Sequence, residues 1–146
     1  MYLTSNAFDQ DEDIPSQYTC DGANVNPSLE FTDIPPEAKS LALIVDDPDS
    51  PTHEWSHWIL FNIPPGIEEI GEGEAPVGCR IGTNDFGNRE YGGPCPSEGR
   101  HRYTFKLFAL DIMLDLPEGA DKEAVEDAME GHILEQAELT AHYSRD

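Results

Sequence analysis

Two short stretches of the sequence carry side chains that could together bind a small polar group. The first is Asp47-Pro48-Asp49-Ser50-Pro51, which follows a buried apolar run and ends six residues before His57. Two carboxylates stiffened by flanking prolines are well placed to orient a nearby imidazole. The alternative is an ordinary proline turn with solvated acids, and it is a strong one in a chain this acidic.

The second stretch is Tyr91-Gly92-Gly93-Pro94-Cys95-Pro96, which Gly99-Arg100-His101-Arg102-Tyr103 follows. Glycines beside prolines allow a fixed loop whose backbone N–H groups face a ligand, as in anion nests. His101 and Tyr103 stand two apart at the start of a predicted strand, so they point to the same face. Both can donate hydrogen bonds to an anion. The alternative is a structural histidine beside an ordinary core tyrosine.

The segment His53-Glu54-Trp55-Ser56-His57 matches the zinc-peptidase pattern H-E-x-x-H. That chemistry needs a helix that brings both histidines to one face and the glutamate to the metal-bound water. Pro51 precedes the match and a strand-like run follows it. In a strand the two histidines would lie some 13 Å apart, at ~3.3 Å per residue. We therefore expect no metal and no cofactor.

A serine hydrolase is the other enzymatic alternative, with Ser50 or Ser56 acting together with His57 and Asp47. Ser56 adjoins His57, so on a strand the two side chains diverge. The chain also lacks the G-x-S-x-G turn that exposes the nucleophile in many hydrolases. We expect a protein without catalytic activity.

The elements that must position these residues are mainly strands. Residues 40–46 and 57–63 are continuous apolar runs, and 102–110 alternates with Tyr103, Phe105, Leu107 and Ala109 on one face. An amphipathic stripe predicts one helix from Asp121 to about Gln136, with Gly131 as a point where it could end or bend, followed by a closing strand over 137–143. Long loops rich in proline and glycine cover 71–101. The pattern predicts one domain over 1–146, a β-sandwich with a single C-terminal helix.

Charge excludes several classes of partner. Thirty Asp and Glu against eight Lys and Arg give a net charge of −22, spread along the whole chain. Nucleic acids and anionic membranes are bound largely through basic side chains, so we expect neither as a partner. At molar salt the Debye length is about 3 Å, which screens the mutual repulsion of such a surface. This composition favours a halophilic, cytoplasmic protein, and the N-terminus lacks the features of a signal peptide.

The three cysteines, Cys20, Cys79 and Cys95, are odd in number and form no C-x-x-C pair. A disulfide framework needs more of them. Reduced, half-buried thiols are the default expectation, although the sequence leaves the pairing open.

Taken together, the two stretches resemble the phosphatidylethanolamine-binding protein family, in particular its bacterial and archaeal Raf kinase inhibitor-like branch. The similarity extends to the N-terminal Ile14–Leu29 and to Ala128–Leu134, so it covers nearly the whole chain. It implies a β-sandwich in which both stretches meet at a small surface cavity. In the family that cavity binds phosphate-like and carboxylate anions, including the phosphatidylethanolamine head group.

The resemblance assigns roles position by position. It implies a ligand-binding site of Asp47, Asp49, Trp55, His57, Gly93, Pro94, His101 and Tyr103, in which Asp49, like Arg102, matches a position behind the residues that touch the ligand. Gly93 and Pro94 would form the rim, where the family often has a cis peptide. A carboxylate beside an imidazole favours its charged form, so we expect Asp47 to raise a histidine pKa.

The expected function is therefore binding of a small anionic or phosphorylated ligand, with a regulatory role. The ligand could also be a phosphorylated side chain of a protein partner. An inhibitor of a protease or kinase that acts through surface loops is the alternative. Nothing apolar or basic in the chain would hold a membrane, and a homodimer is suggested by the resemblance alone.

Overall fold

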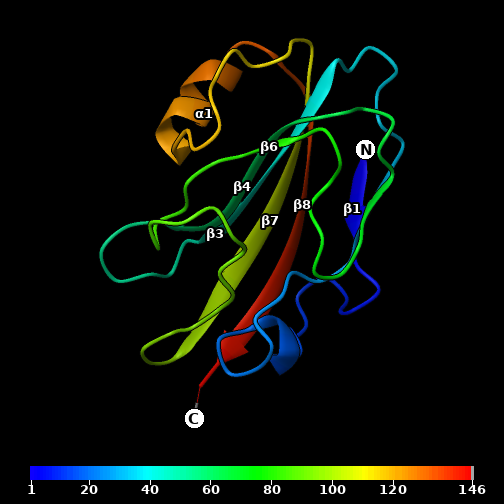
Figure 1. Cartoon of the computed structure of the whole chain (residues 1–146). Coiled ribbons are helices and arrows are strands. Elements are labelled where there is room, and N and C mark those ends of the chain that lie inside the picture. The colour runs from blue at the N-terminus through cyan, green and yellow to red at the C-terminus, as the bar shows by residue number, and fades with distance from the viewer. Residues whose placement is uncertain (146) are drawn as a thin grey trace.

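The long apolar runs of the sequence form the centre of one antiparallel sheet (Figure 1). The computed structural model describes residues 1–145. The order of the sheet is β6-β4-β3-β7-β8, and its strands are β3 (Ser40–Asp47), β4 (Trp55–Ile63), β6 (Arg80–Ile81), β7 (Arg100–Leu110) and β8 (Ile133–Ser144). Strands β3 and β4 are buried on both faces because different elements cover the two sides of the sheet.

A smaller antiparallel sheet covers one face of the large sheet. Its order is β1-β2-β5, with β1 at Tyr2–Thr4, β2 at Leu29–Thr32 and β5 at Glu69–Ile70. A short 3-10 helix, η1, spans Ser16–Tyr18. The core between the sheets is continuous and includes alternate residues of β7, Phe105, Leu107 and Ala109. The two-residue alternation of β7 is thus confirmed, and so is the predicted β-sandwich.

The helix α1 (Lys122–Met129) covers the opposite face of the large sheet (Figure 1). Its side chains Val125 and Met129 pack on residues of β3, β4 and β7 that point away from the sandwich core, among them Ile44 and Phe61. The carboxylate of Asp121 caps its N-terminus by accepting from the N–H of Ala124 at 2.9 Å. No helix among residues 1–145 has the length and apolar character needed to cross a membrane.

The helix is shorter than its sequence pattern predicts. It ends at Met129, where we expected about Gln136, and residues from Ile133 onward belong to β8 instead of the helix. The cause is Gly131, whose positive φ of 82° turns the chain back toward β7. Ile133 then lies opposite Leu110 in the sheet. The short strands β1, β2, β5 and β6 were also not predicted, because each offers too few residues for a periodic pattern.

Candidate functional site

The pairing of β3 with β4 places His57 in an irregular position. Val45 lies opposite Trp58, and the next residue, Asp46, lies opposite Ser56. His57 is therefore the extra residue of a β-bulge. Bulges often stand next to functional sites, where they change the direction of a side chain. Here the bulge lies at the end of β4 where the loops after β3 and before β7 also meet.

A cavity of about 230 Å³ lies at this end of the large sheet, and its lining residues are Asp47, Ser50, Pro51, Trp55, His57, Phe86, Cys95, Pro96, Ser97, His101 and Tyr103. Five of these are residues that the sequence predicted for ligand binding. The rings of His57 and His101 both lie against the Tyr103 ring, with centroid distances of 5.3 and 6.3 Å. The structure thus brings the two distant stretches together, while their role in binding stays a prediction.

Both ring nitrogens of His101 face acceptors within the protein. Nδ1 lies 2.7 Å from Oδ2 of Asp47, and Nε2 lies 3.1 Å from the carbonyl oxygen of Glu98. Asp47 is itself buried, and its other oxygen accepts from the N–H of Asp49 at 2.8 Å. Both ring nitrogens of His101 are therefore occupied by groups of the protein itself.

His57 is bound in a different way, through the loop before β7. Its Nδ1 lies 2.6 Å from the carbonyl oxygen of Gly92, and the N–H of Gly92 donates to the carbonyl of His57 at 3.1 Å. Burial lowers the pKa of His57 below 6.5, and the Gly92 carbonyl and the carboxylate of Asp47 offset this only in part. Asp47 thus acts on His57 in the expected direction, but burial outweighs it and the net pKa of His57 is lowered.

Gly93 and Pro94 do not line the cavity, contrary to their predicted place at its rim. They are buried against the N-terminal segment: the N–H of Gly93 donates to Oδ1 of Asn24 at 2.8 Å, and the carbonyl of Pro94 accepts from Cys20. A Cβ at Gly93 would lie 2.3 Å from the carbonyl oxygen of Tyr18, so no larger residue fits. No peptide bond among residues 1–145 is cis. The rim is formed instead by the next three residues, 95–97.

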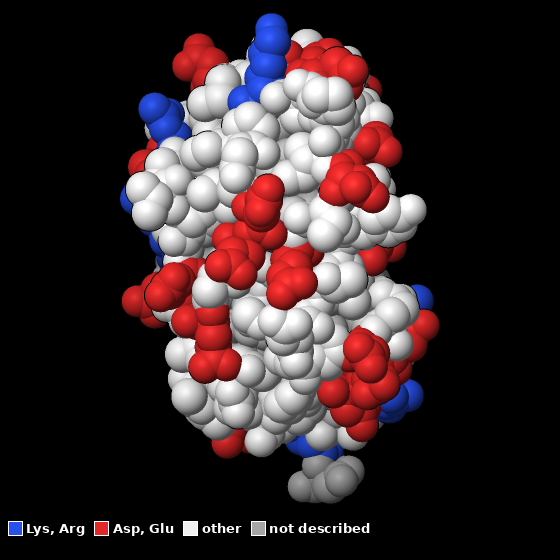
Figure 2. Space-filling model, turned by 90° about the vertical axis from the view of Figure 1, so that its right-hand side faces the viewer, with Lys and Arg blue, Asp and Glu red and all other residues white. Residues whose placement is uncertain are grey.

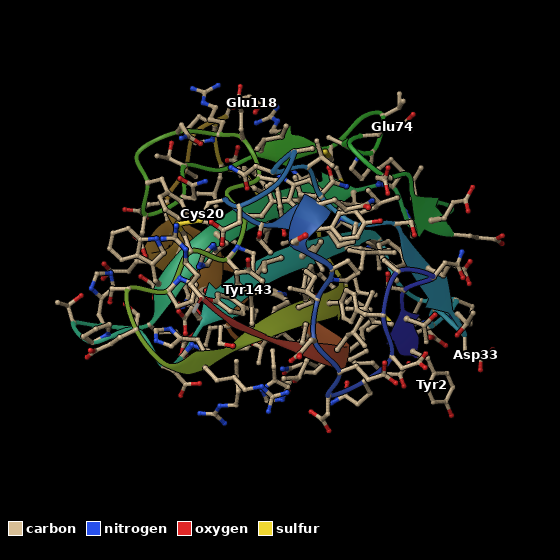
Figure 3. All side chains as sticks on the ribbon, turned by 90° about the horizontal axis from the view of Figure 1, so that it is seen from below. Tyr2, Cys20, Asp33, Glu74, Glu118 and Tyr143 are labelled. Carbon is tan, nitrogen blue, oxygen red and sulfur yellow. A yellow bond between two sulfur atoms is a disulfide. The ribbon has the colours of Figure 1, made fainter. Side chains whose placement is uncertain are left out.

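A disulfide joins Cys20 to Cys95, so the expectation of reduced thiols is wrong for these two residues. The bond links the N-terminal segment to the loop that lines the cavity. Figure 3 shows Cys20 at the same end of the molecule as Tyr143, whose hydroxyl donates to Asp21 at 2.6 Å. Cys79 is free and half-buried, and burial raises its pKa to about 11.

Asp49 lies outside the cavity lining and forms an ion pair with Arg102. Nη2 of Arg102 lies 2.9 Å from Oδ1 of Asp49, and its Nε lies 3.0 Å from Oδ2. The backbone N–H of Arg102 also donates to this carboxylate. The hydrogen bond from the Arg102 side chain is the main cause that lowers the pKa of Asp49 to about 2. The pair connects the loop after β3 to the start of β7, and thereby fixes both walls of the cavity.

The sequence interpretation missed the loop after β6, which supplies Phe86. The Phe86 ring stands edge-on to His57 at 5.2 Å and to Trp55 at 5.6 Å. Asn84 holds this loop: its buried amide donates to the carbonyls of His57 and Glu90, and its Oδ1 accepts from the N–H of Phe86. A lone aromatic in the polar run Thr83-Asn84-Asp85-Phe86-Gly87-Asn88 was the only available indication.

A second charged cluster lies on the α1 side of the large sheet, away from the cavity. Asp46 is completely buried there, with Lys122 and Lys106 at 3.1 and 3.5 Å and the Glu54 carboxyl beside it. Burial is the main cause that raises the pKa of Asp46 to about 7, and Glu54 adds to it, while both lysines oppose the shift. The pKa of Glu54 falls to about 2. The two carboxyls therefore retain one proton between them well above pH 4.

The residues of the zinc-peptidase pattern do not lie on a helix, because His53 precedes β4 and His57 lies within that strand. His53 is exposed in the loop before β4, and its Nε2 lies 3.3 Å from Asp85. Ser56 points to the α1 side of the sheet, so it diverges from His57 as the strand interpretation required. Within residues 1–145, no three His, Cys, Asp or Glu side chains are grouped as metal ligands.

The fold is a β-sandwich of two packed antiparallel sheets, with one helix on the outer face of the large sheet. The cavity at the end of the large sheet, which aromatic and histidine rings line, is its candidate ligand site. The sequence matches the family model described as phosphatidylethanolamine-binding protein over residues 4–144. The chain therefore belongs to the phosphatidylethanolamine-binding protein family, in its bacterial and archaeal branch, as the sequence motifs predicted.

Curated relatives and solved structures agree with this assignment. A UPF0098 protein of Methanothermobacter thermautotrophicus is 53% identical, with 99% of each chain covered, and one of Chlamydia muridarum is 46% identical over the whole of both chains. The crystal structure of a putative phosphatidylethanolamine-binding protein homolog, CT736 of Chlamydia trachomatis, has a TM-score of 0.95 at 43% identity, covering 99% of this chain and 97% of its own. Escherichia coli YbcL, described as a member of the mammalian family, has a TM-score of 0.93 at 30% identity, with 99% and 98% covered.

Proposed function

We propose that the chain binds a small anionic or phosphorylated group in the cavity beside His57 and Tyr103, and that it acts as a regulatory binding protein without catalysis. The observation that carries this proposal is the hydroxyl of Tyr103. It is buried at the cavity wall and has no hydrogen-bond partner among the described residues. Burying a hydroxyl without a partner costs about 1–3 kcal/mol. A ligand oxygen in the cavity would accept its proton and remove that cost.

The walls of the cavity suit a compact charged group. His101 and Asp47 form a buried pair within the site, with 2.7 Å between Nδ1 and Oδ2. The rings of Trp55 and Phe86 also line the cavity, and Phe86 packs against His57. Such a mixture of apolar walls and a few oriented polar groups is typical of small-ligand sites.

The net charge of the whole protein determines how we expect anion binding to depend on salt. Acidic side chains are spread over the face in Figure 2, and Lys and Arg appear only near its margins. A protein with a net charge of −22 repels an anion at low ionic strength, and salt screens that repulsion. Anion affinity should therefore increase as an inert salt is raised toward molar concentrations. The same surface is consistent with the cytosol of a salt-loving cell.

The test compares two tyrosine variants that each lose one buried hydroxyl. Tyr103→Phe removes the unpartnered hydroxyl of the cavity. Tyr91→Phe removes one that is bound to the carbonyl of Tyr18 at 2.8 Å outside the cavity. A hydrogen bond to a charged acceptor contributes about 1.5–3 kcal/mol, so Tyr103→Phe should weaken inorganic phosphate binding by about tenfold or more. Calorimetric titration in constant molar KCl measures both affinities.

Tyr91→Phe should leave phosphate affinity unchanged while lowering the free energy of unfolding by about 1 kcal/mol. Tyr103→Phe should not destabilise the fold, because its hydroxyl has no partner in the free protein. The proposal fails if phosphate does not bind to the unmodified chain at any salt concentration, or if both variants bind phosphate as it does.

A further inference from the structure

The end of the large sheet that lies away from the cavity carries two turns that contain paired prolines. Residues 33–39 connect β2 to β3, and residues 64–66 follow the end of β4. Because β3 and β4 are antiparallel, the start of β3 and the end of β4 lie at the same end of the sheet. Figure 3 shows Asp33 at the opposite end of the molecule from Cys20, which is bonded to the cavity loop. A site formed by these turns is therefore separate from the cavity.

A groove runs along β2 between the two turns. It consists of two adjoining hollows of about 610 and 550 Å³, which share four residues, Phe31, Thr32, Gly66 and Glu68. Residues 29–30 of β2 pair with β5, and one further bond joins the N–H of Phe31 to the carbonyl of Glu68 at 2.7 Å. Beyond this bond the chain turns away at residues 64–67. Within residues 1–145, the end of β2 at Thr32 therefore has no strand beside it on the β5 side.

The groove combines apolar walls with an acidic rim. Its apolar residues, which are all at least partly exposed, are Ile34, Pro35, Pro36, Pro65 and Ile67. Its acidic residues are Glu30, Asp33, Glu68 and Glu69. No Lys, Arg or His of the described chain lines either hollow. None of the four acids forms an ion pair within residues 1–145.

This uncompensated charge distinguishes the groove from the cavity end of the molecule. There, Asp49 is paired with Arg102 at 2.9 Å and Asp21 with Arg145 at 3.0 Å. The side of the molecule on which β1 lies in Figure 1 faces the viewer in Figure 2, with acidic side chains across its middle and Lys and Arg only near its margins. A partner that supplies positive charge would compensate these acids, and apolar side chains would gain by covering the walls.

We propose that this groove binds an extended segment of a partner protein in which basic and apolar residues alternate. Successive side chains of an extended chain point to opposite sides. The apolar side chains can then lie on the proline walls while the basic ones reach the acidic rim. Extended peptides are commonly bound beside an exposed strand, with alternate side chains in pockets. The proposal goes beyond anion binding and does not depend on it.

Two other occupants match the groove less well. A second copy of this chain would place the same four acids opposite one another across a two-fold interface, and such like-charge contacts are costly. A small polycation such as spermine would compensate the acids but would leave the apolar walls uncovered. An extended basic and apolar segment satisfies both parts of the groove.

The first test measures peptide binding to the full chain by fluorescence anisotropy. The probe is a labelled seven-residue peptide in which Lys and Val alternate. It should bind, its counterpart with Glu in place of Lys should not, and its counterpart with Ser in place of Val should bind about tenfold more weakly because the apolar contacts are lost. Raising KCl from about 0.15 to 1 M shortens the Debye length from about 8 to 3 Å, so it should weaken binding of the Lys/Val peptide. This is opposite to the salt dependence expected of phosphate.

The second test separates the groove from the net charge of the protein. Glu68 lines both hollows, whereas Glu126 is exposed on α1, across the large sheet. Glu68→Lys and Glu126→Lys change the net charge equally. Glu68→Lys should weaken binding of the Lys/Val peptide about fivefold at about 0.15 M KCl, and Glu126→Lys should change it by less than about twofold. The two variants should bind phosphate alike.

Four results would overturn the proposal. The first is absence of binding by the Lys/Val peptide, and the second is equal weakening by the two variants. The third is binding of the Lys/Ser peptide as tightly as the Lys/Val peptide, or displacement by equimolar spermine, which would indicate a site for small polycations. The fourth is a dimer in sedimentation velocity that Glu68→Lys dissociates, which would assign the groove to a second copy. None of these results affects the anion cavity, because it lies at the other end of the sheet.

Discussion

The disulfide between Cys20 and Cys95 gives the strongest stability prediction. It closes a loop of 75 residues and fixes the N-terminal segment against the loop that lines the cavity. In the chain-entropy model, such a cross-link restricts the unfolded state by about 4 kcal/mol. Replacing both cysteines with serine should lower the free energy of unfolding by about that amount. The free energy of unfolding of a typical domain is about 5–15 kcal/mol, so the disulfide would account for a large part of it.

The assay is equilibrium denaturation followed by tryptophan fluorescence, at fixed molar KCl so that charge repulsion does not differ between samples. The unmodified chain treated with a reductant should unfold at the same denaturant concentration as the double variant. Cys79→Ser is the matched control, because Cys79 is half-buried and unpaired. It should change stability by less than about 1 kcal/mol. A double variant as stable as this control would refute the reasoning.

Three further changes test other parts of the account. Asp46 has its pKa raised from 3.8 to about 7 by burial and by Glu54, so the folded state holds more protons than the unfolded state between those values. The free energy of unfolding should therefore fall as pH rises from about 4 to 7, and Asp46→Asn should remove that fall in a series of denaturation curves. Gly93→Ala forces a methyl against the carbonyl of Tyr18 and should cost about 1–3 kcal/mol of stability, measured as a lower denaturation midpoint; an unchanged midpoint would contradict the packing described. Asn84→Ala should cost about 1–3 kcal/mol and also weaken phosphate binding in a titration, since it frees the loop with Phe86, and unaltered affinity would separate that loop from the site.

The sequence predicted the elements with a strong local pattern. The apolar runs around Leu43 and Leu60 and the alternation around Phe105 are read from neighbouring residues, and each is long enough to fix its own face. The convergence of Asp47, His57, His101 and Tyr103 was also predicted, by family motifs in addition to local pattern. These residues stand at strand ends that neighbouring strands of one sheet bring together.

What the sequence missed depends on long-range geometry. The amphipathic pattern of the sequence continues beyond α1 to His132 and Ile133. The positive φ of Gly131 in the structure is what shows that the chain leaves the helix before them. The pairing of Cys20 with Cys95 joins positions that no spacing rule relates.

The roles of the glycines and histidines also depend on contacts that no local pattern shows. A glycine is required at position 93 for packing, because the carbonyl of Tyr18 occupies the space that a side chain would need. The sequence did not specify which histidine would pair with Asp47, and the structure pairs it with His101, while His57 lies against the carbonyl of Gly92.

One NMR titration tests the central claim most directly. The chain has five histidines, of which His57 and His101 line the cavity beside Tyr103. With inorganic phosphate added in molar KCl, the ring resonances of His57 should shift and saturate, while those of the exposed His53 stay in place. If His57 does not respond at low or at molar salt, or if both histidines shift alike, the cavity is not a phosphate site.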